Sequence, residues 1–350
     1  MRAFRKRPML GMVLVSLVAT IVGIAISLAI DWFPTQASTA ADDIDFLYDV
    51  LLVASVPIFV LVMAVVIYSV VLFRAEPGDL SDGAPIHGNT RLEVFWVTIP
   101  FILVSVISVY SWVVLNDIEA EQPNELVVNV TGQQFAWRFE YPEEGKVKSN
   151  QLVLAKDRPV YFRVRSDDVI HDFFVPEFRL KTDAVPGLTT KIRVTPNRLG
   201  TYQVVCAELC GLGHSTMRQD ARVVSTQEFD EWLGKQREEE SASAGGDQAS
   251  AGKRVFTGEG CAACHSLADA GSASAIGPEL DGLTATARRM GDRTGRSPEE
   301  IVRAAIKDPD AELTREFRSG VMPTDFDKRL SPGEIDSLVK YLLDVTGGGK

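Results

Sequence analysis

Three long apolar segments occupy the first third of the chain and set it apart from the rest. They span residues 9–30, 47–73 and 94–115. Each is long enough to cross a bilayer core as a helix, which takes about 20 residues. The first follows basic residues and precedes small ones, so it fits either an uncleaved membrane helix or a signal peptide. We expect residues 1–45 to hold this segment with an outer loop, and residues 46–116 to form a membrane hairpin.

Basic residues predict how these segments are oriented. They precede the first segment and lie between the second and the third: Arg2, Arg5, Lys6, Arg7, Arg74 and Arg91. Positive loops stay in the cytoplasm, so we expect everything after residue 116 on the outer face of a bacterial cell membrane. Glu93 begins the third segment, where it is either a solvated flank or a carboxylate that passes protons inward.

The next region, residues 125–224, has the pattern of a β-domain. Short stretches rich in β-branched and aromatic residues are separated by Gly, Pro, Asn and Asp, which is typical of a sandwich or barrel. Helical spacing begins only at residues 227–240. The predicted strands span residues 126–131, 135–141, 160–165, 191–195, 202–206 and 221–224.

Metal-binding side chains cluster at the end of this β-region. Cys206, Cys210, His214 and Met217 lie within twelve residues. Sulfur ligands with imidazole favour copper, and a mononuclear blue-copper site uses one cysteine. The second thiolate therefore indicates two copper ions bridged by both sulfurs. Each ion then needs an imidazole, and His171 is the other histidine of the region.

A second motif follows a charged, small-residue stretch at residues 233–251, which we expect to be a flexible linker. Cys261, Cys264 and His265 form a Cys-x-x-Cys-His pattern, to which haem c is attached through both thiols, with the histidine on the iron. A thioredoxin-like redox pair, or two local disulfides among the four cysteines, are the alternatives. The first would need a βαβ setting, and no such pattern surrounds the motif.

The haem motif is followed by helical patterns and two candidate axial ligands. A methionine ligand raises the haem potential. We favour Met322, which precedes a proline and a final helix, over Met290 in a polar stretch. Capping boxes beginning at Ser297 and Ser331 predict two helices. We therefore expect a small all-α module over residues 252–347.

Composition excludes one class of partner. The net charge is −11, and no cluster of Lys and Arg follows the membrane segments. Binding to nucleic acid depends on such clusters. We therefore expect no nucleic acid partner.

The string from Cys206 to Met217 resembles the copper loop of cytochrome c oxidase subunit II, and the likeness covers residues 46–232. The resemblance implies a cupredoxin-like β-barrel over residues 117–232. It also implies that the carboxylate of Glu208 reaches a magnesium ion at the junction with subunit I, and that Glu93 lies at the mouth of a proton pathway. The implied ligands of the dinuclear copper A centre are His171, Cys206, Cys210, His214, Met217 and the backbone carbonyl of Glu208.

The last module resembles class I cytochrome c, including Gly277-Pro278 between the haem motif and Met322. Together the two resemblances imply subunit II of a terminal oxidase with a fused cytochrome c. Such a subunit takes electrons from a cytochrome c or cytochrome bc complex and passes them through haem c and copper to subunit I. There oxygen is reduced to water and protons are pumped, with subunit III as a further expected partner.

One residue departs from the family pattern. Phe135 stands where the family has the first tryptophan of a Trp-x-Trp pair, and Trp137 keeps the second. We therefore expect electrons from the chain's own haem. The rival functions are a component of a nitric or nitrous oxide reductase, and a copper carrier for assembly. The membrane hairpin argues against the first, and the closed five-ligand loop with its haem module against the second.

Overall fold

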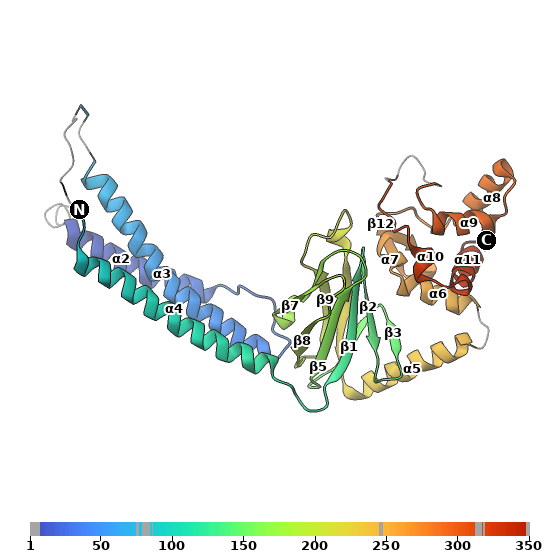
Figure 1. Cartoon of the computed structure of the whole chain (residues 1–350), viewed down its shortest axis with the longest axis horizontal. Coiled ribbons are helices and arrows are strands. Elements are labelled where there is room, and N and C mark those ends of the chain that lie inside the picture. Colours follow the sequence, from blue (N-terminus) through green and yellow to red (C-terminus); the bar gives the residue numbers. More distant parts are fainter. Residues whose placement is uncertain are drawn as a thin grey trace. The chain divides into compact units, whose positions relative to one another are not determined.

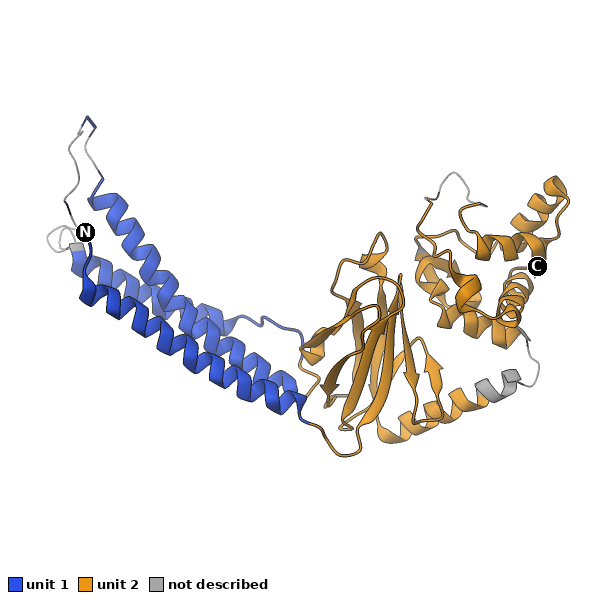
Figure 2. Ribbon diagram, viewed as in Figure 1, with its two compact units in different colours: residues 1–35, 40–120 blue, residues 36–39, 121–350 orange. Residues whose placement is uncertain are grey.

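The computed structural model describes residues 8–74, 77–78, 85, 87–244, 248–311, 317 and 319–347. Contacts divide the chain into two compact units, residues 1–35 with 40–120 and residues 36–39 with 121–350 (Figure 2). The first unit contains the apolar segments. The second contains both predicted metal-binding motifs.

The first unit consists of three long helices, labelled in Figure 1. They are α2 (Pro8–Ala29), α3 (Ala40–Leu72) and α4 (Thr90–Glu119). Each is long and apolar enough to cross a membrane, and most of their large apolar side chains are exposed, as surfaces that face lipid require. Helix α2 packs closely on α3 at Gly23, where a Cβ would lie 2.8 Å from Val56. The chain is a membrane protein.

The sheet domain of the second unit is a sandwich of two five-stranded sheets. Their strand orders are β3-β2-β1-β5-β8 and β4-β10-β9-β6-β7. Alternate side chains of the strands meet between the sheets, and the rings of Trp137, Phe162 and Phe173 are buried there. The strands are β1 (Leu126–Gln133), β2 (Ala136–Tyr141), β3 (Val147–Ser149), β4 (Leu152–Ala155), β5 (Val160–Ser166), β6 (His171–Val175), β7 (Leu180–Ala184), β8 (Thr190–Val194), β9 (Gly200–Cys206) and β10 (Arg218–Val224).

All six predicted strands are present, and four further strands were not expected. Three of these, β3, β4 and β7, lie at the edges of the two sheets. Two of the three are only three and four residues long, and β7 has three consecutive polar residues between Leu180 and Ala184. Such short or polar segments carry a weak strand signal.

The segment expected to be a flexible linker, residues 233–251, is largely helical among the residues that the structure describes. Helix α5 (Thr226–Ala244) runs through most of it, and α6 (Gln248–Gly258) begins before it ends. Glu, Lys, Arg, Gln and Ala are strong helix formers. Composition suggested a tether, whereas these propensities favour a helix.

The haem-motif module packs its helices around a second core. Helices α6 and α11 cross closely at Gly252, where a Cβ would lie 2.1 Å from the carbonyl oxygen of Ser337. Phe256, Ile301 and Leu338 are buried between the helices. A short ribbon of β11 (His265–Leu267) and β12 (Ser272–Ala275) is an addition to the expected all-α module. The helices are α7 (Cys261–Cys264), α8 (Leu283–Thr294), α9 (Pro298–Lys307), α10 (Phe326–Arg329) and α11 (Pro332–Gly347).

Candidate metal centres

The sulfur-containing end of the sheet domain brings together the residues predicted to hold copper. The Sγ atoms of Cys206 and Cys210 lie 3.8 Å apart, whereas a disulfide needs about 2.05 Å. The Nδ1 atom of His171 lies 3.9 Å from the first sulfur, and that of His214 lies 3.5 Å from the second. Each sulfur thus has its own imidazole.

A weaker donor stands beside each sulfur. The Sδ atom of Met217 lies 3.8 Å from the Sγ atom of Cys210, and the carbonyl oxygen of Glu208 lies 3.1 Å from the Sγ atom of Cys206. The two sulfurs are therefore available to both metal positions. Each position adds one imidazole and one weak ligand of its own. Soft sulfur with imidazole suits copper, so the residues present fit two copper ions.

Strand pairing explains how His171 meets the cysteine loop from 35 residues upstream. His171 begins β6, Cys206 ends β9, and these strands pair antiparallel with Phe173 opposite Cys206. The loop that follows closes on itself, because the backbone N–H of Cys206 donates to the carbonyl of Met217 at 3.1 Å. The ligands therefore rest on paired strands rather than on a free loop.

Asp168 holds the ring of His171 from its other side. Its Oδ1 atom lies 2.8 Å from the Nε2 atom of His171, whose side chain is fully buried. Burial alone would lower the pKa of His171, but the hydrogen bonds to Asp168 and Cys206 raise it. Burial would likewise raise the pKa of Asp168, and the hydrogen bonds from His171 and the backbone N–H of Gln134 lower it instead. A carboxylate in this position directs Nδ1 of the imidazole at the sulfurs.

The two thiols of the cluster titrate as a pair. Hydrogen bonding with Cys210 lowers the pKa of Cys206, against the opposing effect of burial. The same contact raises the pKa of Cys210. Metal ligation requires that both sulfurs be thiolates.

Three neighbours of the cluster were not predicted as part of it. Asp168 precedes His171 by three residues in a loop, and that proximity was the available signal. The side chain of Gln134 donates to the carbonyl of Cys210 at 2.6 Å. The ring of Phe135 covers Gly213, where a Cβ would lie 2.4 Å from it. These two contacts join distant parts of the chain. The family resemblance had already singled out Phe135, whereas only the fold reveals the role of Gln134.

Two carboxylates named by the sequence lie elsewhere. The side chain of Glu208 is exposed. Glu93 lies in the first turn of α4, where its Oε1 atom accepts the backbone N–H of Asn89 at 3.0 Å. Asn89 is the N-cap and accepts the N–H of Leu92. In the structure Glu93 therefore helps to cap a helix.

The second motif places its thiols on one helical turn, α7, with His265 immediately after it. The Nδ1 atom of His265 lies 2.8 Å from the carbonyl oxygen of Pro278, which orients the ring so that Nε2 is the free nitrogen. Gly277 allows the close approach, because a Cβ there would lie 2.7 Å from the ring. These contacts give the Gly277-Pro278 pair a structural role beside the histidine.

Burial governs the titration of this motif. It raises the pKa of Cys261 to about 12 and also raises that of Cys264, and it lowers the pKa of His265. A neutral imidazole is the form that ligates metal. The residues therefore fit haem attachment. The two candidate sixth ligands, Met322 and Met290, are both partly buried against the module core.

Three family models match the chain in the same order as its membrane helices, its sheet domain and its haem-motif module. The chain matches the family model for the transmembrane domain of cytochrome c oxidase subunit II over residues 12–114, and that for its periplasmic domain over residues 146–224. It matches the cytochrome c family model over residues 249–346.

Individual proteins match over most of their length. Cytochrome c oxidase subunit 2 of Synechocystis sp. is 30% identical over 62% of this chain and 82% of its own. The same subunit of Alkalihalophilus pseudofirmus is 30% identical over 84% and 86% respectively. A crystal structure of the periplasmic domain of subunit II of cytochrome oxidase from Bradyrhizobium japonicum is 28% identical, with a TM-score of 0.32 over 33% of this chain and 96% of that one.

Proposed function

Because the chain belongs to the cytochrome c oxidase subunit II family, we propose that it receives electrons at a covalent haem c. It then passes them through a dinuclear copper centre to the haems of subunit I. There oxygen is reduced to water and protons are pumped. The observation that carries this proposal is the pairing of each buried sulfur, Cys206 and Cys210, with one imidazole nitrogen.

The residues divide the work between the two centres. Cys261 and Cys264 would hold the haem covalently, and His265 and Met322 would ligate its iron. The ligands of the copper centre are His171, Cys206, Glu208, Cys210, His214 and Met217. When bound, the copper pair supplies a one-electron relay that shares an unpaired electron between two metals. Strand β6 and Asp168 keep the imidazole of His171 in place, so this ligand moves little when the charge changes.

The surroundings of the sheet domain supply the rest of the proposal. The exposed side chain of Glu208 is available to a magnesium ion at the junction with subunit I, because Mg²⁺ prefers carboxylate oxygens. Both soluble modules stand on the outer face of a bacterial cell membrane, as the positive-inside rule predicts. Glu93 at the start of α4 is the candidate for proton uptake, and subunits I and III are the expected partners.

Purification of the complex that contains this chain tests the proposal. We expect oxygen uptake with a reduced cytochrome c as donor, a seven-line copper resonance, and a chain mass that includes one haem. Nitric oxide turnover without oxygen uptake, or a four-line mononuclear copper spectrum, would contradict it.

Removal of residues 252–350 tests the route of electrons. The departure at Phe135 predicts that the truncated complex loses most of its oxidase activity with external cytochrome c, while its copper spectrum stays unchanged. Full activity of the truncated complex would show that electrons enter the copper domain directly.

A further inference from the structure

The inner face of β1 loses its side chains where the strand reaches the copper cluster. Leu126, Val128 and Val130 alternate along the strand, and all three are buried in the core between the sheets. Side chains two residues apart lie on the same face of a strand, so the next inward position is Gly132. Another large apolar side chain would continue the core there, and the glycine interrupts the row.

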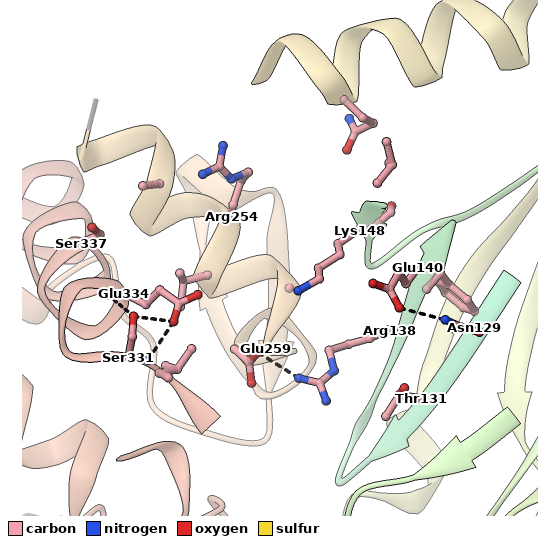
Figure 3. A pocket seen from close by; sticks show the side chains of 18 of the residues that line it. Asn129, Thr131, Arg138, Glu140, Lys148, Arg254, Glu259, Ser331, Glu334 and Ser337 are labelled. Carbon is pink, nitrogen blue, oxygen red and sulfur yellow. Dashed lines mark hydrogen bonds and ion pairs between the residues drawn. The ribbon is translucent and has the colours of Figure 1, made fainter. Parts of the chain in front are cut away.

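The outward positions of the same strands agree with this alternation. Asn129 and Thr131 on β1 and Arg138 on β2 lie on the opposite face, where they line a polar cleft of about 720 Å³ (Figure 3). The register of the sheet pairs Gly132 with Trp137. Residues paired across two strands share a face, so Gly132 and Trp137 both belong to the inward face.

The ring of His171 fills the space that Gly132 leaves. A Cβ on Gly132 would lie 3.0 Å from the Cδ2 atom of His171 and 3.0 Å from the Cζ3 atom of Trp137. Carbon atoms pack best at about 3.5–4.0 Å, so even one methyl group would displace one of the two rings. A glycine within a strand often marks such a close approach. The imidazole therefore depends on the missing side chain at this position.

Three residues surround the ring of His171, and we call Gly132, Trp137 and Asp168 the histidine slot. Trp137 meets the imidazole edge to face, with ring centroids 6.0 Å apart and an interplanar angle of 66°. Asp168 contacts its Nε2 atom at 2.8 Å. The carbonyl of Gly132 accepts the backbone N–H of Asp167 at 3.1 Å. Gly132 thus also anchors the loop that carries Asp168.

The indole of Trp137 is retained at a cost to the core. The residue is fully buried, and its Nε1 atom has no hydrogen-bond partner among the residues that the structure describes. A buried donor without a partner lowers stability, and phenylalanine would avoid that loss. Proteins break such rules mainly at functional sites. The unpaired N–H therefore favours a role for the wide ring beside His171.

We propose that Gly132 and Trp137 are positioning residues for the copper ligand His171, which fix the plane of its imidazole. Asp168 sets the tautomer of the ring, whereas the slot sets its rotation. Rotation of the ring would turn Nδ1 away from the Sγ atom of Cys206, which lies 3.9 Å from it. Metal sites depend on ligands whose rotamers are locked by packing. The inference rests on the copper binding proposed above and is independent of oxygen reduction.

The variant Gly132→Ala tests the slot in the full-length chain of the purified complex. Its methyl group enters the space beside His171, and the backbone hydrogen bond to Asp167 is retained. We expect copper to be lost to a competing chelator at about tenfold lower chelator concentration, with a changed hyperfine pattern in the copper resonance. The control is Gly234→Ala on α5, where nothing lies within 4 Å of a Cβ. It should retain copper as the wild type does.

The variant Val128→Ala separates positioning from a general loss of packing. Val128 is fully buried on the same face of β1, about 13 Å along the strand from Gly132. Its truncation leaves a cavity and lowers the stability of the sheet domain, but it does not enter the slot. We expect a lower melting temperature with wild-type copper retention. Copper loss equal to that of Gly132→Ala would overturn the proposal in favour of instability.

A double-mutant cycle tests whether both positions act on the same ring. Trp137→Phe removes the ring edge that faces Gly132, so this variant alone should also weaken copper retention. In the variant that combines it with Gly132→Ala, the methyl group and the smaller ring share the space. The combined loss of retention should therefore be smaller than the product of the two single losses. Losses that multiply would show independent effects and overturn the slot.

Hydrogen exchange provides a measurement that needs neither copper nor turnover. In the copper-free chain, displacement of His171 should loosen the loop before it. We expect Gly132→Ala to accelerate exchange in residues 166–171 about threefold or more, and Gly234→Ala to leave it unchanged. Wild-type exchange in Gly132→Ala would overturn the proposal. The expected exchange in a complex that reduces no oxygen would refute the proposed function alone.

Discussion

At the scale of single residues, the position of one imidazole depends on one carboxylate. Asp168 accepts a hydrogen bond from Nε2 of His171, which leaves Nδ1 directed at the sulfur of Cys206. Partners of this kind fix the tautomer and the orientation of a ligand. The residue has no direct contact with the sulfurs among the hydrogen bonds of the described chain, so its effect passes through His171.

The variant Asp168→Asn tests this role. Loss of such a partner typically lowers metal affinity by about 10- to 100-fold, so we expect copper to be lost to a competing chelator at about tenfold lower chelator concentration. The control is Asp183→Asn, an exposed carboxyl on β7. Equal copper retention in both variants would mean that Asp168 does not position the ligand.

At the scale of elements, one buried tyrosine joins the two sheets of the sandwich. Tyr141 on β2 donates to the carbonyl of Val153 at 2.9 Å and accepts its backbone N–H at 2.8 Å. Val153 belongs to β4 of the other sheet. Burial raises the pKa of Tyr141 far above its usual value, so the hydroxyl stays neutral and serves as both donor and acceptor.

The variant Tyr141→Phe leaves both backbone groups of Val153 without their partner. An unsatisfied buried polar group costs about 1–3 kcal/mol, so we expect a loss of about 2 kcal/mol in the free energy of unfolding of the sheet domain, measured by chemical denaturation. Tyr161→Phe is the control, because that ring is only half-buried on β5. A stability equal to that of the control would contradict the role of the hydroxyl.

A second element-scale contact ties the last helix of the haem-motif module to its first. Tyr341 on α11 donates to the carboxylate of Asp269 at 2.7 Å, and Lys253 on α6 lies 3.0 Å from it. The hydrogen bonds from Tyr341 and then Lys253 lower the pKa of Asp269. Its ionised form therefore stabilises the fold above the unfolded pKa, near pH 4, and this contribution is lost as the pH falls through the folded value.

The variant Tyr341→Phe should lower the stability of the module by about 1 kcal/mol at neutral pH. The difference in stability from the wild type should shrink as the pH falls below about 4. Thermal unfolding of the module at a series of pH values measures this difference. Asp292→Asn, an exposed carboxyl on α8, should show no such dependence. A difference that stays constant down to pH 2 would rule out a role for the charge of Asp269.

At the scale of the whole molecule, metal sites and folding should be linked in the sheet domain. The sulfur cluster joins β6 and β9 with the loop that enters β10. A ligand that binds only the folded state stabilises it, by about 4 kcal/mol at 1,000 times its dissociation constant. The copper centre is thus expected to act as a clamp between strands as well as a relay.

Removal of copper with a chelator should lower the melting temperature of the sheet domain while that of the haem-motif module stays unchanged, measured by calorimetry. The variant Cys210→Ser lacks one bridging sulfur, so its melting temperature should not respond to the chelator. A wild-type sheet domain that melts at the same temperature with and without the chelator would show that copper is not coupled to folding.

The sequence by itself determined the order of the parts and the types of residue at both sites. Apolar runs predicted the membrane hairpin and left the first run open between a membrane helix and a signal peptide. Ligand spacing within the loop from Cys206 to Met217 and around His265 is local, so it can be recognised without the fold. The short apolar stretches predicted a sandwich or barrel, although β6 and the edge strands β3, β4 and β7 were missed. Local composition also misled at residues 233–251, where helix propensity prevailed.

Only the tertiary structure decided which distant residues meet. The approach of His171 to Cys206 depends on the pairing of β6 with β9, and the contact of Gln133 with Glu259 joins residues 126 positions apart. No periodicity in a chain encodes such contacts, because they arise when separate elements bury their apolar faces together. The role of Asp168 beside His171 therefore became visible only in the folded molecule.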